Sequence, residues 1–154
     1  MFFPSYSSLI SPLTLGIHEL GHLALSFFGE FFGILGGTLF QVLAPILGLI
    51  NFYRQEDFFA LILCFGWLST SLFDMAKYVA DARAMNLPLV SPFGSDNVIH
   101  DWNYLFTRMG LLENDASIAF IVKCLATAAM LICLMGGFWL LWQMKKSSRQ
   151  VSVN

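Results

Sequence analysis

The sequence contains little charge, and this scarcity argues against a soluble globular protein. Of its 154 residues 12% are charged, against about 25% in typical soluble domains. Hydrophobic residues make up 57% of the chain, 16 of them Phe, and the mean hydropathy is +0.70. A chain this small cannot cover its surface with 8 basic and 10 acidic side chains. We therefore expect an integral membrane protein, with the lipid bilayer as a partner.

An excess of basic charge and a set of paired cysteines are also lacking. The net charge of −2 leaves no basic patch to bind phosphates, so nucleic acid is excluded as a partner. The three cysteines are an odd number without CxxC spacing, which argues against a disulfide framework and a cysteine metal site. We expect Cys64, Cys124 and Cys133 to pack as small apolar residues.

Long apolar runs are abundant, and a helix needs about 20 such residues to cross a bilayer. They predict four transmembrane helices, at about residues 12–28, 31–51, 57–82 and 116–143. Ser11 and Pro12 fit the start of the first helix, and Gly29 fits its end. One long extramembrane loop, 83–115, and a basic tail, 144–154, remain. The expected fold is an all-α, polytopic membrane protein forming a single domain, 1–154.

Basic residues predict the orientation of this domain in the membrane. Lys145, Lys146 and Arg149 follow the last helix, and Arg54 lies in the second connection. Two further basic residues, Arg83 and Arg108, lie in the loop. Because basic residues concentrate on the cytoplasmic side, we expect a cytoplasmic C-terminus. With four spans the N-terminus is cytoplasmic too, and we expect the membrane to be a bacterial inner membrane.

Residues 18–22, with the sequence HELGH, match the motif HExxH in an apolar helix. Residues four apart lie on the same helix face, so His18 and His22 can bind one Zn²⁺. Glu19 lies about 100° further round the helix, where it can act as the general base toward a metal-bound water. Gly21 leaves room beside the motif for close approach of another helix or a substrate. The competing interpretation is a pair of hydrogen-bonded core histidines, with Glu19 paired across helices.

A catalytic zinc site generally has three protein ligands, and Asp74 is the first candidate for the third. It lies in the third apolar run, where a lone carboxylate requires a cation. The alternative is an ion pair with Lys77, three residues later. Asp81 shares a helix face with Asp74 and Tyr78 and is a weaker candidate. We expect Tyr78 and Asp81 to orient the ligand carboxylate without binding the metal themselves.

His100 and Asp101 form the other cluster of chemically capable residues, within the loop. Either could be the third metal ligand, or could stabilise the oxyanion formed during hydrolysis. The alternative is a loop histidine packed among Trp102 and Tyr104 at the membrane interface. The sequence leaves these alternatives open.

Three features together resemble the catalytic core of the site-2 protease family of zinc intramembrane peptidases. They are HELGH, the segment GGTLFQVLAPILG at 36–48, and Asp74 in a later helix. The resemblance covers about half of the chain. It implies that His18, His22 and Asp74 bind zinc and that Glu19 is the catalytic base.

The sequence thus favours an integral-membrane zinc metalloprotease that hydrolyses a peptide bond of a membrane protein or peptide, in or beside the membrane. One alternative is a small, non-enzymatic subunit of a larger membrane complex, bound to other membrane subunits, that keeps a metal site or its remnant. Another is a zinc hydrolase that acts on a lipid or a small amide.

Overall fold

Every element that the structure describes is a helix. The structure is a computed structural model that describes residues 10–87 and 100–151, with side chains as far as Ser147. The elements in chain order are α1 (Ser11–Leu25), η1 (Ser26–Phe28), α2 (Glu30–Arg54), α3 (Phe58–Ala80), α4 (Asp101–Met109), η2 (Leu112–Asn114) and α5 (Asp115–Val151). This part of the chain contains no strand, and the expected all-α class is confirmed.

Three helices are long and apolar enough to cross a membrane, as expected of an all-α membrane protein. They are α2, α3 and the segment Leu112–Ser147, which includes most of α5. The first apolar run differs from the expected span. Its helix, α1, has 15 residues and is therefore about 22 Å long at 1.5 Å per residue. This length is less than the ~30 Å of a bilayer core.

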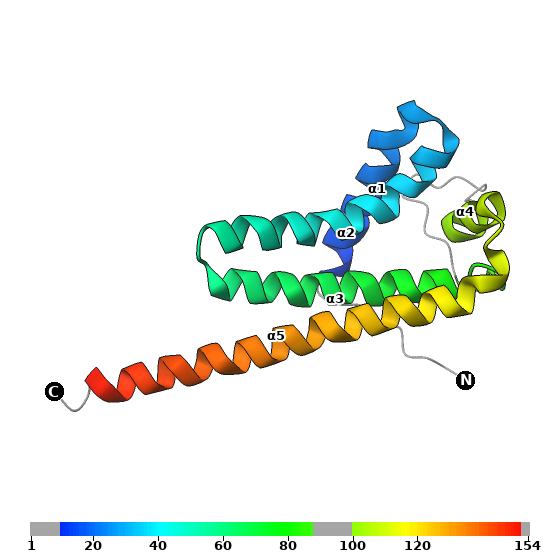
Figure 1. Ribbon diagram of the computed structural model, residues 1–154. Coiled ribbons are helices and arrows are strands. Elements are labelled where there is room, and N and C mark those ends of the chain that lie inside the picture. The colour runs from blue at the N-terminus through cyan, green and yellow to red at the C-terminus, as the bar shows by residue number, and fades with distance from the viewer. Residues whose placement is uncertain (1–9, 88–99, 152–154) are drawn as a thin grey trace.

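The chain reverses direction soon after HELGH, and this reversal explains why α1 is short. Pro12 lies in the first turn of α1, as expected, but the helix ends at Leu25 and is followed by one turn of 3₁₀ helix. Gly29 then adopts a φ of 102°, which side chains with a Cβ rarely allow. From there α2 packs back against α1, so that the two helices form a hairpin (Figure 1).

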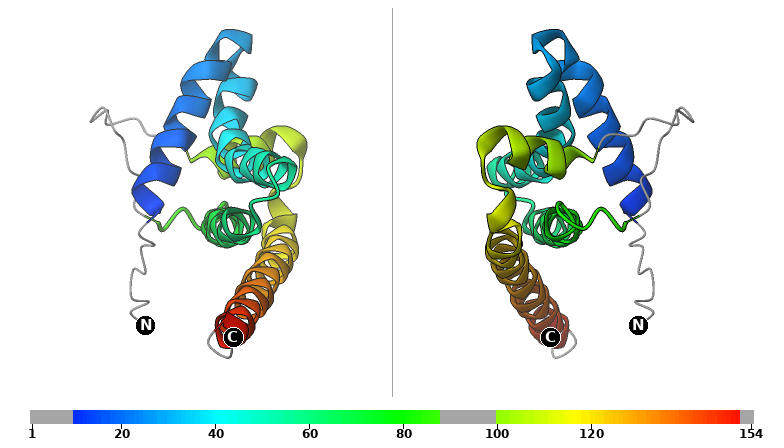
Figure 2. Two further views of the ribbon diagram at one scale, coloured as in Figure 1. Left: turned by 90° about the vertical axis from the view of Figure 1, so that its left-hand side faces the viewer. Right: turned by 90° about the vertical axis from the view of Figure 1, so that its right-hand side faces the viewer.

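The spanning helices lie side by side, and the hairpin rises from them. Most of α2 lies beside α3, and α3 lies beside α5, while α1 and the start of α2 project from this layer (Figures 1 and 2). α2 changes direction along its length, and it contains Pro45. Because proline has no N–H, the carbonyl of Gln41 loses its helical partner and the helix can bend there.

Small residues bring α3 and α5 together along the layer. Leu72 and Ala76 of α3 are buried against Val122 and Ala126 of α5. The hydroxyl of Ser69 donates a hydrogen bond to the Ala126 carbonyl at 2.7 Å. Close packing of small side chains with an interhelical hydrogen bond is typical of helices within a membrane.

A second cluster seats α4 where α3 ends and α5 begins. Phe106 of α4 is buried with Val79, Ala82 and Ala119. The segment expected as a loop, 83–115, therefore contains a packed helix, although its residues 88–99 lie outside the described part. The expected basic tail also differs, because α5 continues as helix to Val151; residues 152–154 lie outside the description.

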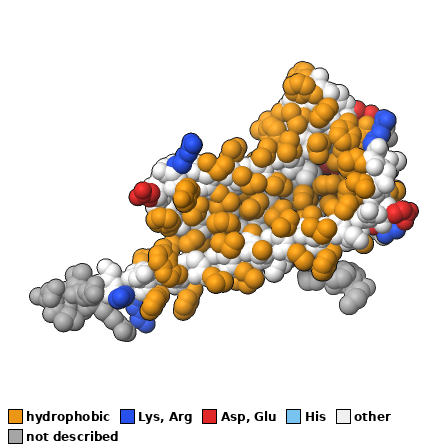
Figure 3. All heavy atoms as spheres, viewed as in Figure 1, with side chains coloured by type: hydrophobic (Ala, Val, Ile, Leu, Met, Phe, Trp, Pro, Cys, Tyr) orange, Lys and Arg blue, Asp and Glu red, His pale blue; other side chains and the backbone are white. Residues whose placement is uncertain are grey.

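Apolar side chains cover the face shown in Figure 3, and charged side chains gather at its two ends. The charges between α2 and α3 are Arg54, Glu56 and Asp57, and those at the α4 end include Glu30, Arg83, Arg108 and Glu113. An apolar band between two charged ends is the pattern of a protein that crosses a bilayer.

Candidate metal centre

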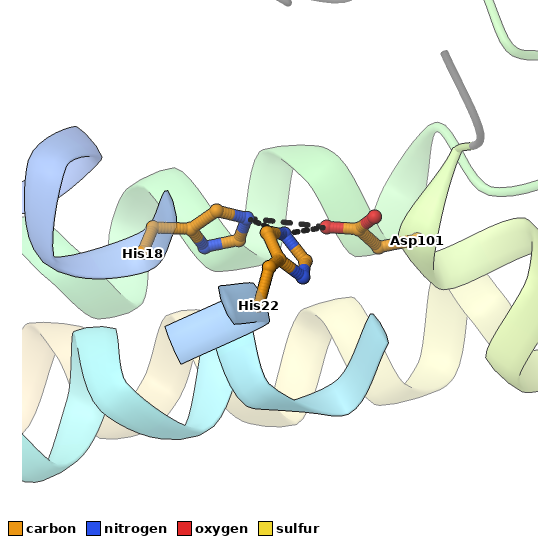
Figure 4. Close-up of side chains that lie close together, drawn as sticks. All are labelled: His18, His22 and Asp101. Atoms are coloured by element: carbon orange, nitrogen blue, oxygen red, sulfur yellow. Dashed lines mark hydrogen bonds and ion pairs between the residues drawn. The ribbon is translucent and has the colours of Figure 1, made fainter. Parts of the chain in front are cut away.

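Two histidines of α1 and one aspartate of α4 point toward a common centre (Figure 4). The Nε2 atoms of His18 and His22 are 2.9 Å apart. Asp101 Oδ2 lies 3.1 Å from Nε2 of His18 and 3.3 Å from Nε2 of His22. The four-residue spacing places both imidazoles on one face of α1, where their rings meet edge to face. Three potential ligand atoms therefore form one small triangle.

The dimensions and chemistry of this triangle fit a zinc ion. Ligand atoms ~2.0–2.1 Å from a tetrahedral zinc lie about 3.3 Å from one another. The three edges measure 2.9, 3.1 and 3.3 Å, at or slightly below that separation. Within residues 10–87 and 100–151 this is the one group of three His, Cys, Asp or Glu side chains that converges in this way.

The outer nitrogens of the two imidazoles fix which atoms face the centre. His22 Nδ1 lies 2.9 Å from the Gly33 carbonyl, which can only accept, so Nδ1 carries the proton. His18 Nδ1 lies 3.0 Å from Oε1 of Gln41. The Gln41 amide nitrogen donates to the Ser71 carbonyl at 3.2 Å, which sets its oxygen toward His18. Both rings therefore turn Nε2 toward the centre, and in the neutral form of each ring that atom carries the lone pair.

Two lone pairs and a carboxylate oxygen cannot satisfy one another, so the centre requires a cation. The carboxyl of Asp101 is mostly buried, which raises its pKa. A proton on Nε2 of His18 or His22 can be donated to this carboxyl, and such hydrogen bonds outweigh burial and hold the pKa of Asp101 below its ordinary value. Asp101 is therefore an anion beside two imidazoles. Either an extra proton on one ring or a metal ion can compensate this arrangement.

The centre is partly open to the surroundings. The exposed fractions of the side chains are 13% for His18, 25% for His22 and 11% for Asp101. A fully enclosed site would leave no route for water or a substrate. This partial exposure is what a site with an open coordination position needs.

Glycines let α2 approach the motif at backbone distance. A Cβ on Gly21 would collide with the carbonyl of Gly36, and a Cβ on Gly36 would collide with the carbonyl of Gly21. The room expected beside Gly21 is therefore taken by another helix. This close approach brings Gly33 and Gln41 within reach of the imidazoles.

α4 begins at the centre because His100 caps it. His100 Nδ1 accepts a hydrogen bond from the backbone N–H of Asn103 at 3.2 Å, and Asp101 is the first residue of the helix. The His100 ring stacks on Tyr78 with 4.3 Å between centroids. Its Nε2 faces Asp81 at 3.4 Å. His100 therefore contacts Tyr78 and Asp81, and its neighbour Asp101 is the residue that reaches the histidine pair.

The second half of α4 is fastened to the start of α2. The hydroxyl of Tyr104 donates to Glu30 at 2.9 Å, and Arg108 lies 3.9 Å from the same carboxylate and over the Tyr104 ring. The amide of Asn103 also donates to the Ala82 carbonyl at 2.7 Å. α4 is thereby held between the hairpin and the end of α3.

Asp74 does not lie at the histidine pair, which corrects the placement expected from the sequence. Its carboxylate pairs with Lys77 at 3.7 Å, and the two side chains are 42% and 57% exposed. α3 meets α1 at an earlier point, where Trp67 Nε1 donates to Thr14 at 3.1 Å. Beyond that bond α1 rises away from the layer, and α4 reaches the pair in place of α3 (Figure 1).

The supporting residues expected around the ligand take other contacts. Asp81 accepts hydrogen bonds from the backbone N–H groups of Asn86 and Leu87, and so holds the chain after α3. Tyr78 contacts the centre indirectly, through its stacking on His100.

Glu19 is the one remaining acid of the motif. It is half-buried on α1, and within the described residues it makes no hydrogen bond or ion pair. A carboxylate next to His18 in the chain and without a partner of its own can act as a proton acceptor.

Gln41, Gly33 and Gly37 are site residues that sequence reasoning did not single out. Gln41 is a lone amide within an apolar helix, and such intramembrane polar residues are expensive unless they have a role. Two adjacent glycines, at 36 and 37, permit a close approach of another helix, but the sequence does not show which atoms they approach. Comparison with protein-family models, with curated proteins and with solved structures gave no significant match.

Proposed function

We propose that this chain is an integral-membrane zinc metallopeptidase in which His18, His22 and Asp101 hold the metal. One observation carries the proposal. Two Nε2 atoms and a carboxylate oxygen, each about 3 Å from the others, meet at the part of α1 that also carries Glu19.

The number of ligands favours an enzyme over a structural metal site. Structural zinc sites generally have four protein ligands, whereas catalytic sites have three and an open position. Three such side chains converge in the described part of this chain. A small subunit that keeps zinc for structure alone would need a fourth ligand.

Each residue of the site has a distinct task in hydrolysis. Zinc, when bound, supplies Lewis acidity and a water whose pKa falls to about 7. The Glu19 carboxylate accepts the proton of the attacking water and passes it to the nitrogen of the leaving amine. Gln41 and the Gly33 carbonyl keep the two imidazoles in the correct tautomer.

We propose that the substrate is a membrane protein or peptide cut near the α4 end of the apolar band. The centre lies between α1 and the start of α4, at the end marked by Glu30 and Arg108. A substrate helix must unwind locally there, because a helix hides its own carbonyls in hydrogen bonds. Partial exposure of His22 leaves an approach for the unwound segment.

The basic residues orient this site toward the non-cytoplasmic side. Lys145 and Lys146 near the end of α5, and Arg54 at the opposite end from α4, favour a cytoplasmic location for those segments. We propose a bacterial inner membrane as the setting. The four-span count that placed the N-terminus in the cytoplasm gives no support here, because α1 is too short to be the fourth span.

Metal analysis of the purified protein in detergent or lipid nanodiscs tests the site. Wild type should hold about one zinc per chain. A His18→Ala/His22→Ala variant should hold none. Asp101→Asn should weaken zinc binding by more than ~10- to 100-fold, which is the usual loss when a residue that only hydrogen-bonds to a ligand is changed.

Asp74→Asn is the matched control, because it removes the same charge from a helix without touching the histidine pair. It should keep full zinc content. Zinc retained by Asp101→Asn but lost by Asp74→Asn would restore the assignment made from sequence and overturn this one.

A further inference from the structure

Gly37 lies directly against the proposed metal ligands. A Cβ built on Gly37 would lie 2.5 Å from Nε2 of His22 and 2.6 Å from Nε2 of His18. The third nearest atom, at 2.6 Å, is Cε1 of His22. Real Cβ atoms essentially never come this close to another heavy atom, so any side chain at position 37 must displace both imidazole tips.

The adjacent glycine meets a different kind of atom. A Cβ on Gly36 would collide with the backbone of Gly21, which cannot move without shifting α1 as a whole. The atoms nearest to a Cβ on Gly37 are the far ends of two side chains, which can rotate away. A side chain would therefore have different effects at the two positions. At Gly36 it would separate two helices, and at Gly37 it would push the two proposed ligands apart.

From this contrast we infer that Gly37 is a positioning residue for the metal: its missing side chain lets the two Nε2 atoms meet, and helix packing does not require it. The inference rests on the proposed zinc site, because it assigns a residue that shapes that site. It explains why α2 carries two successive glycines where one would suffice for the close approach to α1.

Zinc affinity and the melting temperature of the metal-free protein, measured on the same variants, test the inference. Gly37→Ala should weaken zinc binding by more than ~100-fold, which is the upper end of the loss seen when residues that support metal ligands are changed. The melting temperature of its metal-free form should fall less than that of Gly36→Ala, because only the two imidazoles turn aside and the helices stay in place. Gly36→Ala should lower that melting temperature.

Gly16→Ala is the neutral control, because a Cβ there meets nothing within 4 Å. It should leave zinc affinity unchanged. A second comparison removes the imidazoles. In a His18→Ala/His22→Ala background, Gly37→Ala should not lower the melting temperature, since the three nearest atoms that its Cβ meets are gone.

The outcomes separate this inference from the proposed function. Zinc bound equally by wild type and Gly37→Ala would overturn the inference and leave the zinc site standing. A loss of stability on Gly37→Ala in the background without histidines would also overturn it, by showing a packing role. A wild-type chain that binds no zinc would overturn the proposed function, and the inference with it.

Discussion

At the scale of single residues, proton placement decides what the centre can hold. The Gly33 carbonyl and the Gln41 amide oxygen fix Nδ1 as the protonated nitrogen of each ring. Binding of the proposed metal would therefore require only the loss of any extra proton at Nε2, and no change of tautomer. In the proposed mechanism Glu19, one residue after His18, accepts the proton of the water.

Glu19→Gln should separate binding from catalysis. The amide cannot accept a proton, so cleavage of a quenched-fluorescence single-span peptide in vesicles should fall by ~10²- to 10⁴-fold. Zinc content should stay at the wild-type value, because Glu19 is not one of the three converging ligands. Glu56→Gln, at an exposed position between α2 and α3, is the control and should retain full activity. A fully active Glu19→Gln variant would exclude this mechanism.

Local periodicity predicted part of the site, and only packing supplied the rest. His18 and His22 are one turn apart, so their common face follows from helix geometry alone. Asp101 lies 83 residues from His18, and its place depends on how α4 docks. Asp74 is the carboxylate that lies within the third apolar run, but α1 leans away from α3, and nothing in the local sequence sets that angle.

At the scale of elements, α4 carries Asp101, the proposed third ligand, and must be held firmly to place it. Its own side chains Leu105 and Phe106 are buried, and its Tyr104 donates a hydrogen bond to Glu30 of α2. The sequence indicated a loop here because residues 83–115 are polar. The helix itself has clear local signals, namely a cap at His100 and a left-handed Gly110 after its last turn.

Loosening α4 should weaken zinc binding without touching a ligand. Phe106→Ala removes a buried ring, a change that typically costs ~3–5 kcal/mol, and should raise amide hydrogen exchange throughout α4. Tyr104→Phe removes one hydrogen bond, worth about 1 kcal/mol, and should give a smaller loss of zinc affinity in the same direction. Met109→Ala, an exposed position, is the control. Equal zinc affinity in all three variants would show that α4 does not position Asp101.

At the scale of the whole molecule, the apolar band between two charged ends sets the topology. Four apolar runs were readable from composition, and three of them are helices of spanning length. The first could not be assigned correctly from hydropathy, because its length depends on the turn at Gly29 and on packing against α2. The composition of this run is equally apolar whether the helix crosses the membrane or turns back within it.

Labelling of single cysteines from either side of sealed vesicles tests this topology. In a background without native cysteines, Gln55→Cys and Ser147→Cys should react with a membrane-impermeant maleimide from the cytoplasmic side. Thr107→Cys, an exposed position of α4, should react from the opposite side. Labelling of all three from one side would contradict a membrane band between the two charged ends.

The separation of the ligands along the chain has a consequence for biosynthesis. The HELGH helix leaves the ribosome well before Asp101 is made, so the nascent chain carries a two-histidine half-site for the time needed to synthesise the intervening residues. Catalytic zinc requires three ligands, and metal loading must therefore wait until α4 has emerged and docked. The enzyme that we propose would stay inert throughout its own insertion, and ion capture would mark the end of its assembly.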